Sequence, residues 1–276
     1  MSPPLDGFRV VALGVNAPLI VAGARLAALG AQVVKIEPPS GDPTGHFAPP
    51  WYAQDTASQR VVRLDLKSEE GRREAEGELA RADALVTAMR PASLGRLGLG
   101  AHALAERFPR LVHVAIVGFA APRQNVAGHD LTYQAALGLI DPPRLPRVLV
   151  ADLAGAEQAV AVVLALLLAR ERGRPERYRE VALAAAAEDF AAPYRFGATS
   201  PDGPVGGGDP LYGLYQAADG WIAVAALEGH FRGRLLDELG VDQADATTLA
   251  AAFRGRAKQD WQAWAEERDL PIAAVA

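Results

Sequence analysis

The stretch Phe8-Arg-Val-Val-Ala-Leu13 decides the fold, because a helical pattern follows this short apolar run almost at once. The helix is expected from about Ala17 to Leu29, with Gly30 as its C-terminal stop. A second β-branched run, Gln32 to Ile36, comes directly after it. Strand, helix and strand in this order are typical of a parallel sheet covered by helices.

The same alternation continues through the first half of the chain. Ser68 is expected to cap a helix, and further strands are expected from Asp83 to Thr87 and from Leu111 to Val117. A long apolar helix is expected from about Leu153 to Arg172. The sequence therefore predicts an α/β fold with a Rossmann-like parallel sheet.

A segment dense in glycine and proline, residues 201–210, separates this part of the chain from the rest. Beyond it, Tyr212 to Ala217 and Trp221 to Ala226 are expected to form a hairpin around Ala218-Asp-Gly220, followed by short helices. We therefore expect a large domain over residues 1–200 and a smaller α+β C-terminal domain over residues 201–276.

Composition and charge narrow the class of function. The 276 residues are 50% hydrophobic, enough to bury a substantial core, and the formal net charge of -5 argues against a nucleic-acid partner. The absence of cysteine excludes disulfides and thiolate sites and is compatible with a cytoplasmic protein. The N-terminus lacks the basic-then-apolar order of a signal peptide, and the longest apolar run, Ala159 to Ala169, has eleven residues. Because spanning a bilayer takes about 20, we expect a cytoplasmic protein without a membrane partner.

The turn after the first strand bears on cofactors. Its sequence, Leu13-Gly-Val-Asn-Ala-Pro-Leu19, lacks the second and third glycines that let a dinucleotide approach a helix. No cluster of His, Asp or Glu has metal-ligand spacing either. We therefore expect neither a metal nor a redox cofactor.

The segment Ala127-Gly-His-Asp-Leu-Thr-Tyr133 and the lone acid Asp152, which follows the strand-like run Val148 to Ala151, are the best candidates for chemistry. A histidine and a carboxylate on a strand edge, facing each other across a pocket, could remove a proton from one face of a carbon and return it to the other. Glu228, after another apolar run, could orient the histidine. The alternative is that His129 is a surface-loop residue and Asp152 a helix N-cap.

Further segments carry a family resemblance when they are taken in order with these candidates. They are Leu29-Gly-Ala-Gln-Val-Val-Lys-Ile-Glu-Pro38, Arg63-Leu-Asp-Leu-Lys-Ser-Glu-Glu-Gly71, Arg90-Pro-Ala-Ser-Leu-Gly-Arg-Leu-Gly-Leu-Gly100 and Ala218-Asp-Gly220. Their order and spacing over nearly the whole chain resemble the class III CoA-transferase superfamily, and within it the alpha-methylacyl-CoA racemase branch. Asp152 stands where the superfamily has its shared aspartate.

The resemblance implies an enzyme that racemises C2 of a 2-methyl-branched acyl-CoA by two-base proton transfer. His129 and Asp152 would lie on opposite faces of C2, burial would raise the pKa of Asp152, and Glu228 would hold the imidazole. One alternative is transfer of CoA between carboxylic acids, with Asp152 as the nucleophile. Another is a catalytically degenerate protein that binds CoA or a partner.

The resemblance also implies how the substrate is held, with coenzyme A as part of the substrate rather than a cofactor. Arg60 and Arg90 fall where basic contacts to the CoA phosphates are expected. Asp130 and Tyr133 could line the same pocket, although Asp directly before a helix is also a common N-cap. The run Gly206-Gly207-Gly208 is either a mobile lid over the acyl group or a plain linker.

The chain departs from the family pattern at several places. Pro38 stands where relatives often carry a polar residue, the block Thr56 to Arg60 differs, and the segment between His129 and Asp152 is shortened. The sequence also stops at Ala276, where relatives continue. The resemblance implies an interlocked homodimer. We expect a homodimer here as well, in which the missing segment could loosen or abolish the interlock.

Overall fold

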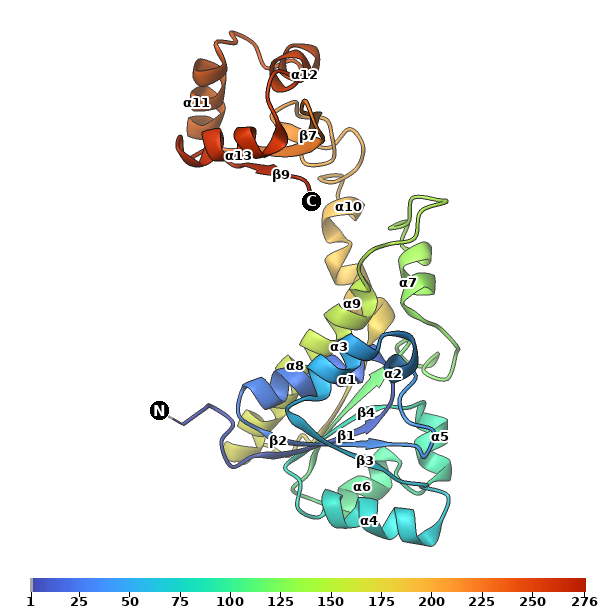
Figure 1. Cartoon of the computed structure of the whole chain (residues 1–276). Coiled ribbons are helices and arrows are strands. Elements are labelled where there is room, and N and C mark those ends of the chain that lie inside the picture. Colours follow the sequence, from blue (N-terminus) through green and yellow to red (C-terminus); the bar gives the residue numbers. More distant parts are fainter. Residues whose placement is uncertain (1) are drawn as a thin grey trace. The chain divides into compact units, whose positions relative to one another are not determined.

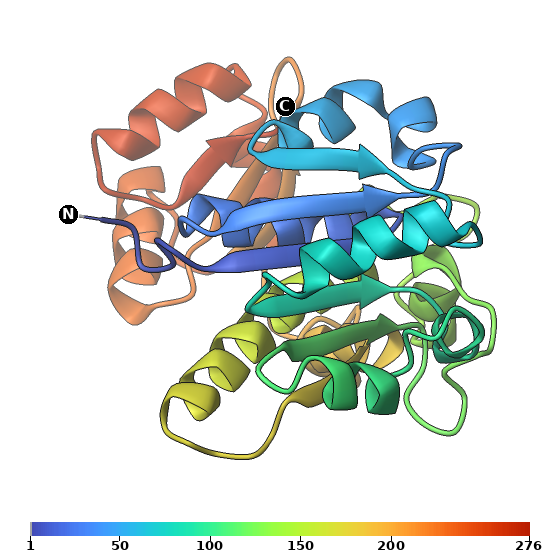
Figure 2. The same ribbon diagram turned by 90° about the horizontal axis from the view of Figure 1, so that it is seen from below.

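The computed structural model describes residues 2–276, which divide into two compact units, residues 2–190 and residues 191–276. The first unit contains a six-stranded sheet in the order β3-β2-β1-β4-β5-β6. Every neighbouring pair in it is parallel, and the strand arrows point the same way in Figure 2. The predicted α/β fold is thus confirmed. The strands are β1 (Arg9–Gly14), β2 (Gln32–Glu37), β3 (Gln59–Arg63), β4 (Ala84–Ala88), β5 (Val112–Val117) and β6 (Tyr178–Ala182).

Helices cover both faces of this sheet (Figure 1). Val10 and Ala12 of β1 pack into the core formed with α1, α8 and α9, whereas Val11 and Leu13 pack into a second core formed with α4, α5 and α6. Strands buried on both faces read as continuous apolar runs, which is why β1 could be recognised in the sequence. The helices are α1 (Ala17–Ala28), α2 (Thr44–Phe47), α3 (Pro49–Thr56), α4 (Glu69–Leu79), α5 (Pro91–Arg96), α6 (Ala101–Arg107), α7 (Asp130–Ala136), α8 (Val150–Glu171) and α9 (Leu183–Phe190).

Helix α8 is the longest element and carries Asp152 in its first turn. The expectation that Asp152 follows a strand was therefore wrong. The helix begins at Val150 because the buried carboxylate of Asp130 accepts hydrogen bonds from the backbone N–H groups of Ala151 and Asp152, which otherwise have no intrahelical partner. By length and composition α8 could cross a membrane, but half of its apolar window is buried inside the unit, as in a core helix.

The second unit has its own antiparallel sheet, in the order β7-β8-β9. The predicted hairpin is confirmed, with Tyr212 of β7 opposite Ala225 of β8. The core of this unit includes Phe253, Trp261 and Trp264, whose rings meet edge to face with centroids 5.1 Å apart. The elements are α10 (Ala192–Arg195), β7 (Tyr212–Gln216), β8 (Trp221–Ala225), α11 (Gly229–Leu239), α12 (Ala246–Phe253), α13 (Lys258–Glu266) and β9 (Ile272–Ala274).

Candidate active site

The candidate site is a cavity of about 310 Å³ in the N-terminal unit, called the main cavity below. Its wall is built from the segments that follow β1, β4 and β5, together with residues of α7 and α8. Strands β1 and β4 flank the point where the strand order reverses. Open α/β sheets bind ligands at that point, beyond the carboxyl ends of the strands. The polar side chains on the wall are Asn16, Arg90, Gln124, His129, Tyr133 and Asp152.

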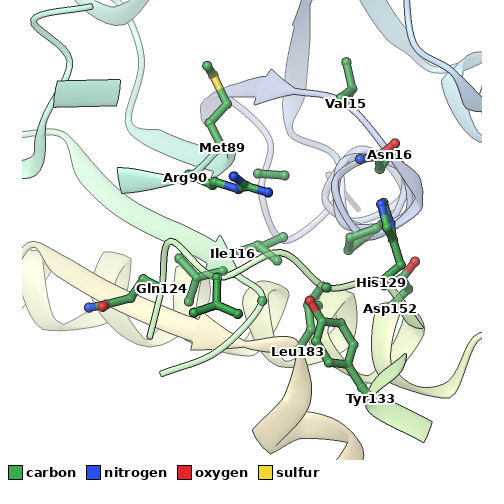
Figure 3. A pocket seen from close by; sticks show the side chains of 16 residues that line it. Val15, Asn16, Met89, Arg90, Ile116, Gln124, His129, Tyr133, Asp152 and Leu183 are labelled. Carbon is green, nitrogen blue, oxygen red and sulfur yellow. The ribbon is translucent and has the colours of Figure 1, made fainter. Parts of the chain in front are cut away.

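The structure brings His129 and Asp152 together on this wall (Figure 3). His129 directly precedes α7, and Thr132 fixes its backbone: the Thr132 hydroxyl donates to the His129 carbonyl at 2.7 Å and accepts from its N–H at 3.1 Å. The histidine side chain itself is exposed. Asp152 enters from the first turn of α8 and is mostly buried. Two groups able to carry protons therefore face one cavity, one from the residue before α7 and one from the first turn of α8.

Asp130 ties these two helices together. Its Oδ1 lies 2.7 Å from the backbone nitrogen of Ala151 and 3.1 Å from that of Asp152. Its Oδ2 accepts from Gln134 Nε2, which also donates to the carbonyl of Val148. With 4% of its surface exposed, Asp130 lies behind the cavity wall instead of lining it. The alternative that Asp130 is the N-cap of the helix after it was wrong, because Asp130 is the first residue of α7 and its carboxylate instead accepts hydrogen bonds from the first turn of α8.

The environment of Asp152 changes its acidity. Burial raises the pKa of the Asp152 carboxyl to about 7, and the negative charge of Asp130 acts in the same direction. An ordinary aspartate of pKa 3.8 would be protonated in roughly one molecule in 1,600 at pH 7, whereas this one is protonated in about half. Asp152 can therefore both give and accept a proton near neutral pH.

Tyr133 also lies on the cavity wall, and only 2% of its surface is exposed to solvent. Its hydroxyl lies against Gly118 and Gly128, and a Cβ added at these positions would come within 2.4 Å and 2.6 Å of the hydroxyl oxygen. A side chain at either position would therefore have to displace the Tyr133 ring. Burial raises the pKa of Tyr133, Asp152 raises it further and Arg90 opposes them, so the hydroxyl stays a neutral donor.

The two predicted CoA contacts, Arg90 and Arg60, lie in different places. Arg90 follows β4 and lines the main cavity. Arg60 lies in β3 outside its wall, with Nη2 2.6 Å from Oε1 of Glu78, which also pairs with Arg81. The structure therefore does not bring Arg60 to the site.

The remaining predicted residues belong to the C-terminal unit. Glu228 is exposed and directly precedes α11. Gly206, Gly207 and Gly208 are exposed in the turn-rich segment before β7, where the N–H of Gly208 donates to the Gly203 carbonyl at 2.9 Å. Their roles in the site stay predictions.

An apolar cavity of about 220 Å³, which the sequence did not predict, adjoins the main cavity. Val15 and Met89 belong to the walls of both, so the two hollows share a boundary. Lys67 lines the apolar cavity as well. Val15 and Asn16 follow the carboxyl end of β1, and Met89 follows that of β4. Because ligands bind beyond these strand ends, this position in the sequence could have identified all three residues as candidates.

Comparisons with known proteins assign the chain to a family. The sequence profile of CoA-transferase family III matches residues 5–276. An alpha-methylacyl-CoA racemase of Mus musculus is 31% identical over 262 residues, covering 87% of this chain and 66% of its own length. A probable fatty acyl-CoA transferase of Mycobacterium tuberculosis is 30% identical over 187 residues, covering 61% of this chain and 48% of its own. The chain thus spans about half to two thirds of the length of these relatives.

The fold is shared with a solved structure. A crystal structure of a hypothetical protein from Mycobacterium tuberculosis superposes with a TM-score of 0.85 at 24% sequence identity. The match covers all of this chain and 86% of the other.

Proposed function

The chain belongs to CoA-transferase family III, and on that premise we propose that it racemises C2 of a 2-methyl-branched acyl-CoA by two-base proton transfer. Membership supports an enzyme that acts on CoA esters, and the relatives at about 30% identity include both a racemase and a transferase. The observation that carries the proposal is that His129 and Asp152 line one cavity while burial brings the pKa of Asp152 close to neutrality.

The proton transfers follow from these two groups. Neutral His129 removes the C2 proton from one face, and the electrons of the C–H bond pass into the thioester as an enolate. Protonated Asp152 then delivers its proton to the opposite face, which inverts C2. The reverse direction starts from ionised Asp152 and protonated His129. A carboxyl of pKa about 7 populates both required forms at neutral pH, and the sequence of steps is redox neutral.

The adjoining cavities suit the two ends of an acyl-CoA. The acyl group and its thioester would occupy the main cavity, where the Tyr133 hydroxyl and the Arg90 guanidinium can stabilise the enolate oxygen. The apolar cavity would take the adenine ring, with Lys67 at its edge for a phosphate. The linking arm would pass Val15 and Met89, which both cavities share.

Deuterium exchange tests the proposal directly. In heavy water, without any acceptor acid, the enzyme should wash deuterium into C2 of either enantiomer of 2-methylbutanoyl-CoA while converting one into the other. The variant His129→Gln should lose racemisation yet keep exchange for the one enantiomer whose proton faces Asp152, and Asp152→Asn should keep it for the other. His102→Gln is the matched control, because His102 is an exposed residue of α6 outside the main cavity.

The outcome separates two-base from one-base chemistry. If both catalytic variants lose exchange with the same enantiomer, the two groups do not act on opposite faces. If the unaltered enzyme incorporates no deuterium into any branched acyl-CoA, the racemase proposal is overturned.

CoA transfer is the second candidate. It is favoured by the transferase relative and by the Asp152 carboxyl, whose side chain accepts no hydrogen bond from any group in residues 2–276 and is free to attack a thioester. Attack would expel CoA as the thiolate and leave a mixed anhydride on Asp152. Hydroxylamine added during turnover with an acceptor acid would trap that adduct, and mass spectrometry would place it on Asp152.

A further inference from the structure

Asn16 has a backbone conformation that its side chain makes unfavourable. It lies between β1 and α1 with φ of 82° and ψ of 163°, a region that glycine occupies freely and other residues almost never do. Strain of this kind persists only where the surrounding structure enforces it, and it concentrates at functional sites. Asn16 also lines the main cavity, as Figure 3 shows at the start of α1.

The usual reason for asparagine at this position does not apply. Asn16 directly precedes α1, where an asparagine side chain normally accepts a hydrogen bond from the first turn of the helix. Here the side chain makes no such bond. Glycine would fit both the helix start and the backbone angles. Within residues 2–276, neither helix capping nor backbone conformation explains why residue 16 is an asparagine. The remaining explanation is the position of its side-chain amide on the cavity wall.

A buried charge cluster holds Asn16 in this conformation. The Lys35 side chain is fully buried and lies 2.9 Å from Oδ2 of Asp42 and 2.7 Å from Oε1 of Glu37. The same Oδ2 accepts the backbone N–H of Asn16 at 2.9 Å. Tyr52 donates its hydroxyl proton to Glu37 Oε1 at 2.7 Å, and Arg63 Nε lies 3.8 Å from Glu37 Oε2. Buried ions bound this tightly resist rearrangement, because removing any partner leaves an uncompensated charge.

We propose that the Asn16 side-chain amide binds the thioester substrate, and that Asp42, held by Lys35, is a positioning residue that keeps Asn16 facing the cavity. The inference rests on the proposed function for the identity of the substrate. The amide supplies two N–H donors and one acceptor, which suit the thioester carbonyl and the amide groups of the CoA arm. The arm passes Val15, the neighbour of Asn16, on its way between the cavities.

The variant Asn16→Gly separates strain from function. Glycine relieves the backbone, so the midpoint of thermal unfolding should rise by about 2 °C, although the chain loses a side chain. The same variant should bind 2-methylbutanoyl-CoA about tenfold more weakly by calorimetry and lose at least as much in kcat/KM for C2 exchange. Asp269→Gly is the matched control, because Asp269 also has a positive φ, of 51°, but does not line the main cavity. It should leave binding and exchange unchanged.

A double-mutant cycle tests the positioning role. Asp42→Asn keeps an oxygen that can accept the Asn16 N–H but weakens the grip of Lys35 on that oxygen. If Asp42 acts through Asn16, the loss in kcat/KM caused by Asp42→Asn should shrink at least about threefold in the Asn16→Gly background. Purely structural damage would lower kcat/KM by the same factor in both backgrounds.

Each result decides a separate claim. Unchanged binding and exchange in Asn16→Gly would overturn the substrate contact, and independent losses in the cycle would overturn the positioning role. An unaltered protein that binds the thioester but exchanges no C2 proton would overturn racemisation and leave the Asn16 contact standing on the binding data. An unaltered protein that does not bind the thioester would overturn both.

Discussion

Replacement of Asp152 by asparagine should make the protein more stable, and the gain should grow with pH. In the folded protein the pKa of the Asp152 carboxyl is raised to about 7, from 3.8 in the unfolded chain. The folded state therefore binds the proton more tightly than the unfolded state does. The favourable contribution of this group is complete below pH 3.8 and is lost as the pH rises to 7. Asparagine is neutral at every pH, so its contribution to stability does not change with pH.

The size of the effect follows from the two pKa values. Each pKa unit corresponds to about 1.4 kcal/mol, so ionising Asp152 in its buried position costs about 4 kcal/mol of unfolding free energy at pH 8. At pH 5 the carboxyl is ionised only in the unfolded chain and is still protonated in the folded protein. The loss of unfolding free energy is therefore smaller there, about 1.7 kcal/mol. The advantage of the variant over the unaltered protein should therefore grow by about 3 kcal/mol between pH 5 and pH 8. The proposed racemisation should be lost in the variant.

Urea unfolding of both proteins at pH 5, 6, 7 and 8 measures this difference. Other titrating groups are common to both proteins, so their contributions cancel in the difference. A stability difference that stays constant from pH 5 to pH 8 would refute the reasoning, because it would mean that Asp152 titrates as an ordinary carboxyl and is ionised at both ends of the range.

Three further predictions concern the cavity and the assembly. Asp130→Asn should lower the pKa of Asp152 by removing a nearby negative charge, which carbon-13 NMR of labelled aspartate carboxyls would detect as an earlier titration; an unmoved titration would contradict the coupling. Gly128→Ala should destabilise the protein by about 1–3 kcal/mol, because its Cβ would meet the Tyr133 hydroxyl, and chemical denaturation with an unchanged midpoint would argue against that contact. We also expect a homodimer, so light scattering at micromolar concentration should give about twice the 29.1 kDa chain mass, and a value near 29 kDa would contradict it.

The sheet could be predicted because its strands are buried on both faces. The run from Phe8 to Leu13 and the helix from Ala17 follow directly from apolar patterning and turn chemistry, and both exist as expected. Strand β3 (Gln59–Arg63) was not predicted, because it lies at the sheet edge and its pattern is mostly exposed and polar. An edge strand takes its conformation from pairing with its neighbour, and a single sequence does not contain that pairing.

The candidate site was predicted in part. His129 and Asp152 were found from their residue types and context, but the start of α8 was misplaced because the group that caps it, Asp130, comes from 21 residues earlier in the chain. Asn16 could not be identified from the sequence, because the turn that contains it shows locally only that the dinucleotide glycines are missing. Its value as a candidate comes from a backbone angle and a buried ion cluster, and neither follows from local sequence patterns.

The carboxylate bridge from Asp130 to α8 also bears on how such a chain can change over evolutionary time. A proline-rich connection separates His129 from Asp152 in the sequence. The hydrogen bond from the Asp152 backbone N–H to Asp130, the residue after His129, joins the two ends of this connection directly. The spacing of the pair is thus independent of the length of the connection. Insertions and deletions in the connection between α7 and α8 are therefore expected to leave His129 and Asp152 in place.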